Sequence, residues 1–246
     1  MKRFVFAAIF VTCAAGSAFA QVDRPLSPLA LAVACAPPPT FDAPEAPLLR
    51  IIGSQDSVAR SLFGDRDLLV IGGGTSAGVQ LGQQFFIRRA ITHGTSPIAH
   101  GARTLGWLRV VAVNQTTAIA IVDHLCNAIV TTDYLEPFVE PVVSADFERD
   151  ETPGQPDFSN LGHIVAGNEG RMTVGVGDFA LIDWGQAQGL EPGARFAIYR
   201  DISVTGMPLA SVGEGVVVST SHKMALTRVT RARDAVYSGD YIALRK

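Results

Sequence analysis

The chain has 246 residues and a formal net charge of −3 at pH 7, and 48% of its residues are hydrophobic while 17% are charged. This composition supplies enough apolar side chains for a folded core and indicates a globular protein. The slightly negative charge offers no general attraction to nucleic acid or to an acidic membrane surface, so nucleic acid is not an expected partner.

The first 20 residues have the organisation of a secretory signal peptide. A positively charged start at residues 2–3 precedes an apolar run over residues 4–12, and Ala18-Phe19-Ala20 forms a small-x-small cleavage site. The apolar run is too short for a comfortable membrane span, and no later segment offers about 20 uninterrupted apolar residues. We therefore expect an exported protein that is periplasmic or associated with the outer membrane and has no transmembrane span after residues 1–20 are removed.

Residues 21–50 form a proline-rich N-terminal segment, which contains one of the two cysteines that remain after signal removal. A disulfide between Cys35 and Cys126 would tie this segment to the first folded module, as suits an oxidising compartment. Two unrelated thiols are the alternative. Residues 31–34 also place a lipoprotein-like Leu-Ala-Val-Ala before Cys35, although a charged, proline-containing stretch separates it from the basic start. The disulfide is the preferred interpretation of the two cysteines, and lipidation of Cys35 is the disfavoured one.

The rest of the chain contains two diverged copies of one module, over residues 51–137 and 161–246, separated by an acidic, proline-containing linker over residues 138–160. The copies align without a gap from Asp67 and from Asp178, until the second copy loses four residues in one loop. The matches fall in order at glycines and alternating apolar positions, which indicates a duplication. The matched pairs are Gly74 with Gly185, Gly78 with Gly189, Gly82 with Gly193, Phe85 with Phe196, Ile87 with Ile198, Arg89 with Arg200, Gly106 with Gly213, Asp133 with Asp240, and Tyr134 with Tyr241.

Each copy is expected to form five or six short strands, because aromatic and β-branched segments alternate with glycine-containing turns and show no convincing helical period. The predicted fold class is all-β, a tandem duplication of a small β-barrel or sandwich-like module. One short helix is expected over residues 54–63, with Ser54 or Asp56 as its cap. Opening strands are expected at residues 51–52 and 164–165. Structural glycine turns are expected at Gly74, Gly78 and Gly82, and at Gly185, Gly189 and Gly193.

The sequence Gly74-Thr-Ser76-Ala-Gly78 fits the Gly-x-Ser-x-Gly pattern that presents a nucleophilic serine in α/β-hydrolases. The pair Asp123-His124 lies downstream. However, the helix that should follow the serine is missing, since residues 79–87 contain a glycine and then favour a strand. Ala187 also replaces Ser76 in the second copy, while the flanking glycines remain. We therefore interpret the turn as structural and expect no catalytic residue; a secreted serine hydrolase that uses Ser76 is the alternative.

No cofactor or metal site is expected from local motifs. Gly72-Gly73-Gly74 lacks the Gly-Lys-Ser/Thr ending of a phosphate-binding loop and the helix that should follow it. None of the five histidines has a His, Cys or Glu at a familiar ligand spacing. His93 and His100 share one polar loop, where a weak adventitious metal site is conceivable, but solvated loop histidines are the favoured interpretation.

A candidate basic patch lies in the second copy at Arg228, Arg231 and Arg233. On alternating positions of a strand, Arg231 and Arg233 would share one face and meet an anionic envelope polymer or an acidic partner. The favoured interpretation is an ordinary solvated face, whose positive charge is partly neutralised by Asp234 and Asp240.

The sequence pattern of the repeated module is clearest in the second copy, over residues 178–241. There a short strand leads into Gly-x-x-x-Gly-Leu-x-Pro-Gly-x-x-Phe-x-Ile-Tyr-Arg, followed by Gly-Glu-x-Val-Val and Ser-Gly-Asp. This pattern resembles small β domains of exported Gram-negative envelope proteins, including the C-terminal domain of flagellar assembly protein T and the domains that follow LysM modules. The resemblance implies an assembly or scaffolding role and supplies no catalytic residues. We expect a non-enzymatic binding or scaffold protein whose partner is a protein or an envelope polymer, with direct binding of peptidoglycan as a further alternative.

Overall fold

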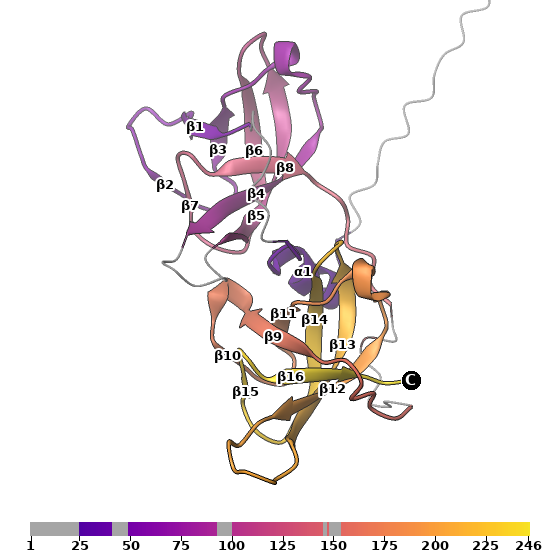
Figure 1. Ribbon diagram of the computed structural model, residues 1–246. Helices are drawn as coiled ribbons and strands as arrows, with labels where there is room; N and C mark the ends of the chain where they lie inside the picture. Colours follow the sequence, from indigo (N-terminus) through magenta and orange to yellow (C-terminus); the bar gives the residue numbers. More distant parts are fainter. Residues whose placement is uncertain (1–24, 41–48, 93–99, 145–146, 148–153) are drawn as a thin grey trace, which may run out of the picture.

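The computed structural model describes residues 25–40, 49–92, 100–144, 147 and 154–246. The predicted all-β class is confirmed: the described chain forms two β modules, stacked one above the other, with one short α-helix between them (Figure 1). The predicted signal peptide and His93 lie outside the described residues. No helix in the described part of the chain is long and apolar enough to cross a membrane.

The second module is a closed barrel with the strand order β11-β14-β13-β12-β16-β9. All neighbouring strands are antiparallel. A small two-stranded sheet, β10 with β15, lies beside the barrel. The strands are β9 (Gly162–Gly167), β10 (Thr173–Val174), β11 (Phe179–Ile182), β12 (Arg195–Arg200), β13 (Ala210–Thr220), β14 (Ala225–Ala232), β15 (Val236–Tyr237) and β16 (Tyr241–Leu244).

The first module has the equivalent order, β1-β3-β6-β5-β4-β8, and its own small sheet of β2 with β7. Its two end strands also meet, because Arg50 and Tyr134 form an antiparallel bridge and the Leu135 amide donates to the Leu49 carbonyl at 2.9 Å. The six-stranded ring is thereby closed in both copies. The strands are β1 (Ile51–Ser54), β2 (Leu62–Phe63), β3 (Leu68–Ile71), β4 (Gln84–Thr92), β5 (His100–Val113), β6 (Ala118–Leu125), β7 (Ile129–Val130) and β8 (Tyr134–Pro137).

Each module has its own core, produced by the in-out alternation of its strands. On β6, Ala118, Ala120 and Val122 are buried while the residues between them are half-buried, because successive side chains of a strand point to opposite faces. The aligned pair Phe85 and Phe196 is buried in the two separate cores. The repeat therefore specifies two independent barrels rather than one sheet shared between the copies.

The helix predicted over residues 54–63 is wrong. Strand β1 continues to Ser54, an irregular loop follows, and β2 begins at Leu62. Asp56, the expected cap, instead accepts hydrogen bonds from the Ser54 hydroxyl at 2.6 Å and from Arg60, which also pairs with Asp67. Almost every side chain of the segment is exposed, so a helix here would have no apolar face to bury, and such burial is the main stabilisation of short helices.

The α-helix lies instead at α1 (Pro28–Cys35), within the proline-rich N-terminal segment, for which no helix was expected. The Ser27 side chain caps it by accepting the Ala30 amide at 3.2 Å, and Pro28 occupies the first turn, where its missing N–H costs nothing. The sequence Pro-Leu-Ala-Leu-Ala-Val-Ala-Cys is apolar on every side. A helix of this kind is stable only when it is buried on more than one side.

Candidate functional site

Helix α1 lies between the two modules (Figure 1), with Ala30 and Ala34 buried and most of its other residues half-buried. On one side, Leu29, Ala32 and Val33 pack against the outer face of the module 2 barrel. On the other side, Ala34 and Leu31 pack against aromatic residues of module 1. We call this region the junction. The buried module 2 residues are Phe179, Leu181, Val216, Val218, Met224 and Leu226; the module 1 aromatics are Phe86, Trp107 and Phe138.

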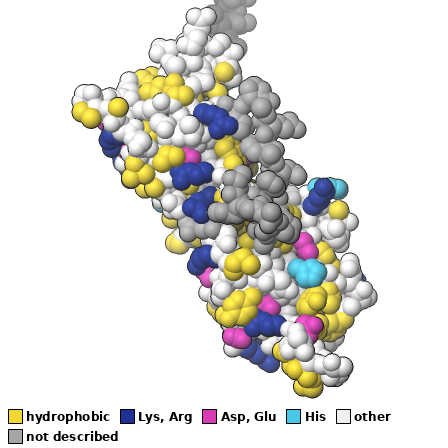
Figure 2. Space-filling view, turned by 60° about the vertical axis from the view of Figure 1, so that its left-hand side comes forward, with side chains coloured by type: hydrophobic (Ala, Val, Ile, Leu, Met, Phe, Trp, Pro, Cys, Tyr) yellow, Lys and Arg dark blue, Asp and Glu magenta, His cyan; other side chains and the backbone are white. Residues whose placement is uncertain are grey.

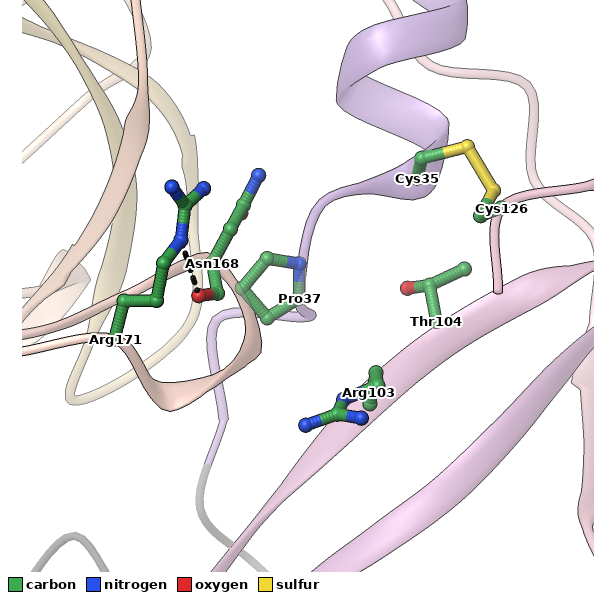
Figure 3. Close-up of a pocket in the computed structure, with 7 residues that line it drawn as sticks. All are labelled: Cys35, Pro37, Arg103, Thr104, Cys126, Asn168 and Arg171. Atoms are coloured by element: carbon green, nitrogen blue, oxygen red, sulfur yellow. Dashed lines mark hydrogen bonds between the residues drawn. A yellow bond between two sulfur atoms is a disulfide. The ribbon is translucent and has the colours of Figure 1, made fainter. Parts of the chain in front are cut away.

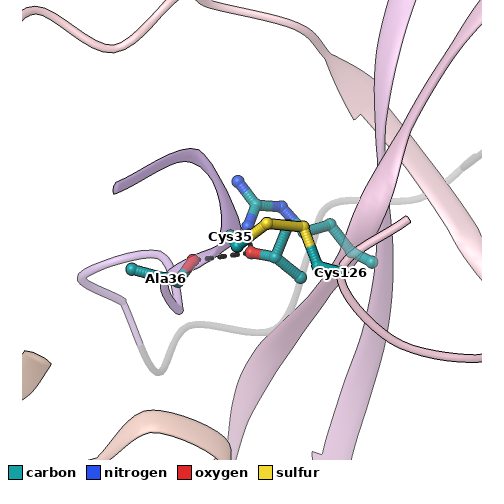
Figure 4. Close-up of a disulfide and its surroundings, with 5 residues drawn as sticks. Cys35, Ala36 and Cys126 are labelled. Carbon is teal, nitrogen blue, oxygen red and sulfur yellow. Dashed lines mark hydrogen bonds between the residues drawn. A yellow bond between two sulfur atoms is a disulfide. The ribbon is translucent and has the colours of Figure 1, made fainter. Parts of the chain in front are cut away.

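The predicted disulfide between Cys35 and Cys126 is confirmed and fastens α1 to module 1 (Figure 4). Cys35 is the last residue of α1 and Cys126 directly follows β6, with their Cα atoms 5.6 Å apart. The cross-link joins residues 91 positions apart, so it strongly restricts the unfolded chain. A sulfur in a disulfide cannot also carry a thioether-linked lipid, so this state excludes lipidation of the Cys35 sulfur.

A chain of hydrogen bonds continues the attachment of α1 beyond the disulfide. The Thr104 hydroxyl donates to the Ala36 carbonyl at 2.6 Å, and the Arg88 guanidinium donates to the Thr104 hydroxyl. Arg88 is buried, stacks 4.4 Å from the centre of the Phe86 ring, and pairs with Glu136 at 3.3 Å. Burial lowers the pKa of Arg88, and the Glu136 carboxylate opposes this shift. A buried cation is tolerated here because it is paired and hydrogen-bonded.

A cavity of about 420 Å³ opens at the junction and borders the disulfide (Figure 3). Both modules contribute to its wall: Arg103 and Thr104 come from β5, and Asn168 and Arg171 come from the turn after β9. Arg171 donates to the Asn168 carbonyl at 3.2 Å. The lining residues are Cys35, Pro37, Arg103, Thr104, Cys126, Asn168 and Arg171.

His124 lies beside the disulfide. Its ring stacks on Trp107, with centroids 4.6 Å apart and planes 26° apart. The donor atoms of His124, Cys35 and Cys126 all lie within 4.8 Å of one another. Sequence reasoning missed this cluster because Cys35 is far away in the chain, so no local ligand spacing exists. The one local signal was the closeness of His124 and Cys126, which are separated by a single leucine.

The second copy has a different chemistry at the same positions. Trp107 on β5 lies opposite His124 on β6, and the aligned residues Glu214 and Arg231 lie opposite each other on β13 and β14. Arg231 pairs with Glu214 at 3.6 Å, and Arg245 pairs with the same carboxylate at 2.6 Å. The candidate basic patch therefore includes an acid that sequence reasoning did not consider.

The two acids expected to compensate the patch bind elsewhere. Asp240 pairs with Arg200 at 2.8 Å, and Asp234 pairs with the same arginine at 3.1 Å. Arg228 donates to the Gly177 carbonyl at 3.5 Å, and Arg233 is exposed. Acidic and basic side chains are interspersed on the face shown in Figure 2.

Ser76 is not brought together with Asp123 and His124. The Ser76 hydroxyl donates to the Gln115 carbonyl at 2.7 Å, at the turn that precedes β6. Asp123 pairs with Arg109 at 3.0 Å near the other end of that strand. The rise of about 3.3 Å per residue puts roughly 20 Å of strand between the turn and His124. The described geometry therefore places no imidazole at Ser76 to act as its base.

The glycine turn around Ser76 has a structural reason for each flanking glycine. A Cβ atom on Gly74 would lie 2.2 Å from the Asn114 carbonyl oxygen, so no larger residue fits without movement of the backbone. Gly78 has φ of +78°, in the left-handed region that favours glycine. The second copy repeats both features at Gly185 and Gly189. The turn thus keeps its shape whether or not a serine is present.

The aligned arginines and aspartates form the same structural clamp in both modules. Arg89 pairs with Asp133 at 2.8 Å, as Arg200 does with Asp240, and each aspartate also accepts a backbone amide. Hydrogen bonds to these aspartates raise the pKa of Arg89 and of Arg200. Since both copies share the clamp, it belongs to the fold, and the junction is the region in which the copies differ chemically.

Comparison with models of known protein families and with curated proteins finds no match to this chain.

Proposed function

We propose that the chain is a non-enzymatic binding or scaffold protein of the Gram-negative cell envelope, which holds two β-barrels in one fixed arrangement. The observation that carries the proposal is the burial of α1 between the modules, together with its covalent attachment at Cys35. A connection made of packed apolar residues and a disulfide suits a protein whose task is to keep two binding surfaces at a set spacing. The disulfide also favours an oxidising compartment such as the periplasm.

The surfaces offered to a partner are loops rather than strand edges. Both six-stranded rings are closed through backbone bonds between described residues, so strand addition to a free edge of either ring is not favoured. The loop between β12 and β13 carries Ile202, Val204 and Met207, which are 44%, 55% and 59% exposed. This loop is at the lower end of the molecule in Figure 1.

The proposal is tested by site-specific photo-crosslinking in the native envelope. A photoreactive residue at Val204 is expected to form a discrete adduct with one protein or envelope polymer. The control is the same residue at Val111, which is 41% exposed on the wall of module 1. Absence of an adduct from Val204, Ile202 and Met207 alike would contradict a scaffold role for this loop. Adducts of equal yield at Val111 would do so too.

A further inference from the structure

We propose that Cys35, Cys126 and His124 form a binding site for Cu(I) when the disulfide is reduced. Among the described residues, this is the one group of at least three His, Cys, Asp or Glu side chains whose donor atoms converge, all within 4.8 Å of one another. The inference is independent of the scaffold role, since it concerns the chemistry of the junction and not its partner.

The donor set selects the metal. Two thiolates, which are soft ligands, together with one imidazole favour Cu(I) and Zn(II) over the hard divalent cations. Structural zinc sites take four protein ligands, whereas this cluster offers three, and its two thiolates are of the kind that selects Cu(I). Two metal–sulfur bonds of about 2.3 Å require the two sulfurs, which are bonded to each other in the disulfide, to separate to roughly 4 Å once the disulfide is reduced.

The surroundings suit a Cu(I) thiolate complex. Cu⁺ with two thiolates and a neutral imidazole has a net charge of −1, and the guanidinium groups of Arg103 and Arg171 line the adjoining cavity. Apolar residues of module 1 and α1, including Ala34 and Trp107, pack on the other side. The stacked Trp107 ring also fixes the plane of the His124 imidazole, so little ordering remains for the metal to impose.

The chemistry balances with a dithiol as the reductant. The dithiol delivers two electrons and two protons to the Cys35–Cys126 disulfide and is itself oxidised to a disulfide. Cu⁺ then displaces the two thiol protons as the two Cu–S bonds form. The cavity leads directly to the half-buried sulfurs, so both the reductant and the metal have a route to them.

The reduced protein is expected to keep its fold. Opening a disulfide lowers stability mainly by releasing a constraint on the unfolded chain. The packing of α1 on both modules and the Thr104 hydrogen bond to Ala36 remain when the disulfide is opened.

The test is anaerobic titration of the phosphine-reduced protein with Cu(I) against a chromophoric Cu(I) chelator. One equivalent is expected to bind, and the oxidised protein is expected to bind none. X-ray absorption is expected to show two sulfur neighbours and one nitrogen neighbour. His124→Ala should weaken affinity by more than about 100-fold, because even the loss of an outer-shell partner costs about 10–100-fold. His222→Ala, at an exposed histidine of module 2, is the matched control and should change nothing.

Four results would overturn the proposal. The first is a folded, reduced protein that binds no Cu(I), and the second is binding that His124→Ala leaves unchanged. The third is Zn(II) holding the site more tightly than Cu(I). The fourth is loss of the near-ultraviolet circular dichroism on reduction, which would show that the reduced site has no folded frame. Because His124→Ala retains both cysteines, its fold is checked in the oxidised state before reduction.

Discussion

Aligned residues on the outer faces of the two barrels differ in their exposure to solvent. Phe179 on β11 and Val218 on β13 are 4% and 3% exposed beneath α1, whereas the aligned Leu68 and Val111 of module 1 are 40% and 41% exposed. A second pair of aligned positions differs in chemistry as well: Trp107 stacks on His124 in module 1, whereas Glu214 forms an ion pair with Arg231 in module 2. Duplication preserved the interior, while the exterior diverged to place one helix between two copies.

The largest expected effect comes from the aromatic side of the junction. Trp107→Ala should lower the free energy of unfolding of module 1 by about 4 kcal/mol, because it deletes a buried ring in contact with Phe86 and Phe138. Glu214→Ala, at the aligned position of module 2, should cost about 2 kcal/mol, since it removes the carboxylate that pairs with both Arg231 and Arg245. Urea denaturation followed by circular dichroism measures both. Equal costs would mean that the two faces do not differ energetically.

Opening the disulfide is expected to cost somewhat less. Cys126→Ser should lower the free energy of unfolding by about 3 kcal/mol, within the usual range for a native cross-link. Reduction of the wild-type protein should cause the same loss in urea denaturation, and hydrogen exchange in α1 should accelerate. The variant itself should not respond to the reductant. A variant as stable as the wild type would show that the packing of α1 alone holds the junction.

The aligned Arg–Asp ion pairs, Arg89 with Asp133 and Arg200 with Asp240, allow the stabilities of a shared feature to be compared between the two modules. Asp133→Asn should cost about 2 kcal/mol, because it weakens a nearly buried hydrogen-bonded ion pair to Arg89. Asp240→Asn should cost less, since Arg200 retains Asp234 and its stacking on Tyr237 at 4.3 Å. The comparison is made by thermal unfolding of the two single variants. A larger loss from Asp240→Asn would contradict this ranking.

The closing strand of module 1 should respond to alkaline pH. Burial, aided by Glu136, raises the pKa of Tyr134 to about 12 from its ordinary value of 10.0. The folded state therefore binds this proton more tightly than the unfolded chain. Its contribution to stability is complete below pH 10 and is lost as the pH rises through about 12. Tyr134→Phe should flatten this part of the stability profile measured by urea denaturation between pH 9 and 12; an unchanged profile would exclude Tyr134 as its source.

The smallest effect is expected at the glycine turn. Ser76→Ala should change stability by less than about 1 kcal/mol, because the hydroxyl makes one exposed hydrogen bond and Ala187 occupies the aligned position. Any turnover of ester substrates should be the same in Ser76→Ala as in the wild-type protein. Ala187→Ser is the converse variant and should be equally neutral. Loss of an esterase activity in Ser76→Ala alone would restore the hydrolase alternative.

The sequence was informative where local rules apply. The alternation on β6 and the left-handed glycine at 78 have short-range physical causes. Gly74, Arg89 and Asp133 make long-range contacts, and the sequence identifies them through their repetition in the second copy. Helix α1 was missed because an all-apolar octapeptide has no helical periodicity, although Ser27 followed by proline is a helix-start signal. The helix expected after Ser54 failed because the segment has no apolar face.

The sequence by itself determined the duplication, the all-β class and the pairing preference of two cysteines. Only the tertiary structure decided that the rings close, that α1 lies between the modules, and that His124 lies beside the disulfide. The physical reason is the range of the interactions. Turns and strand alternation depend on neighbours in the chain, whereas the junction brings together Cys35 and Cys126 from 91 positions apart through packing on two separate barrels.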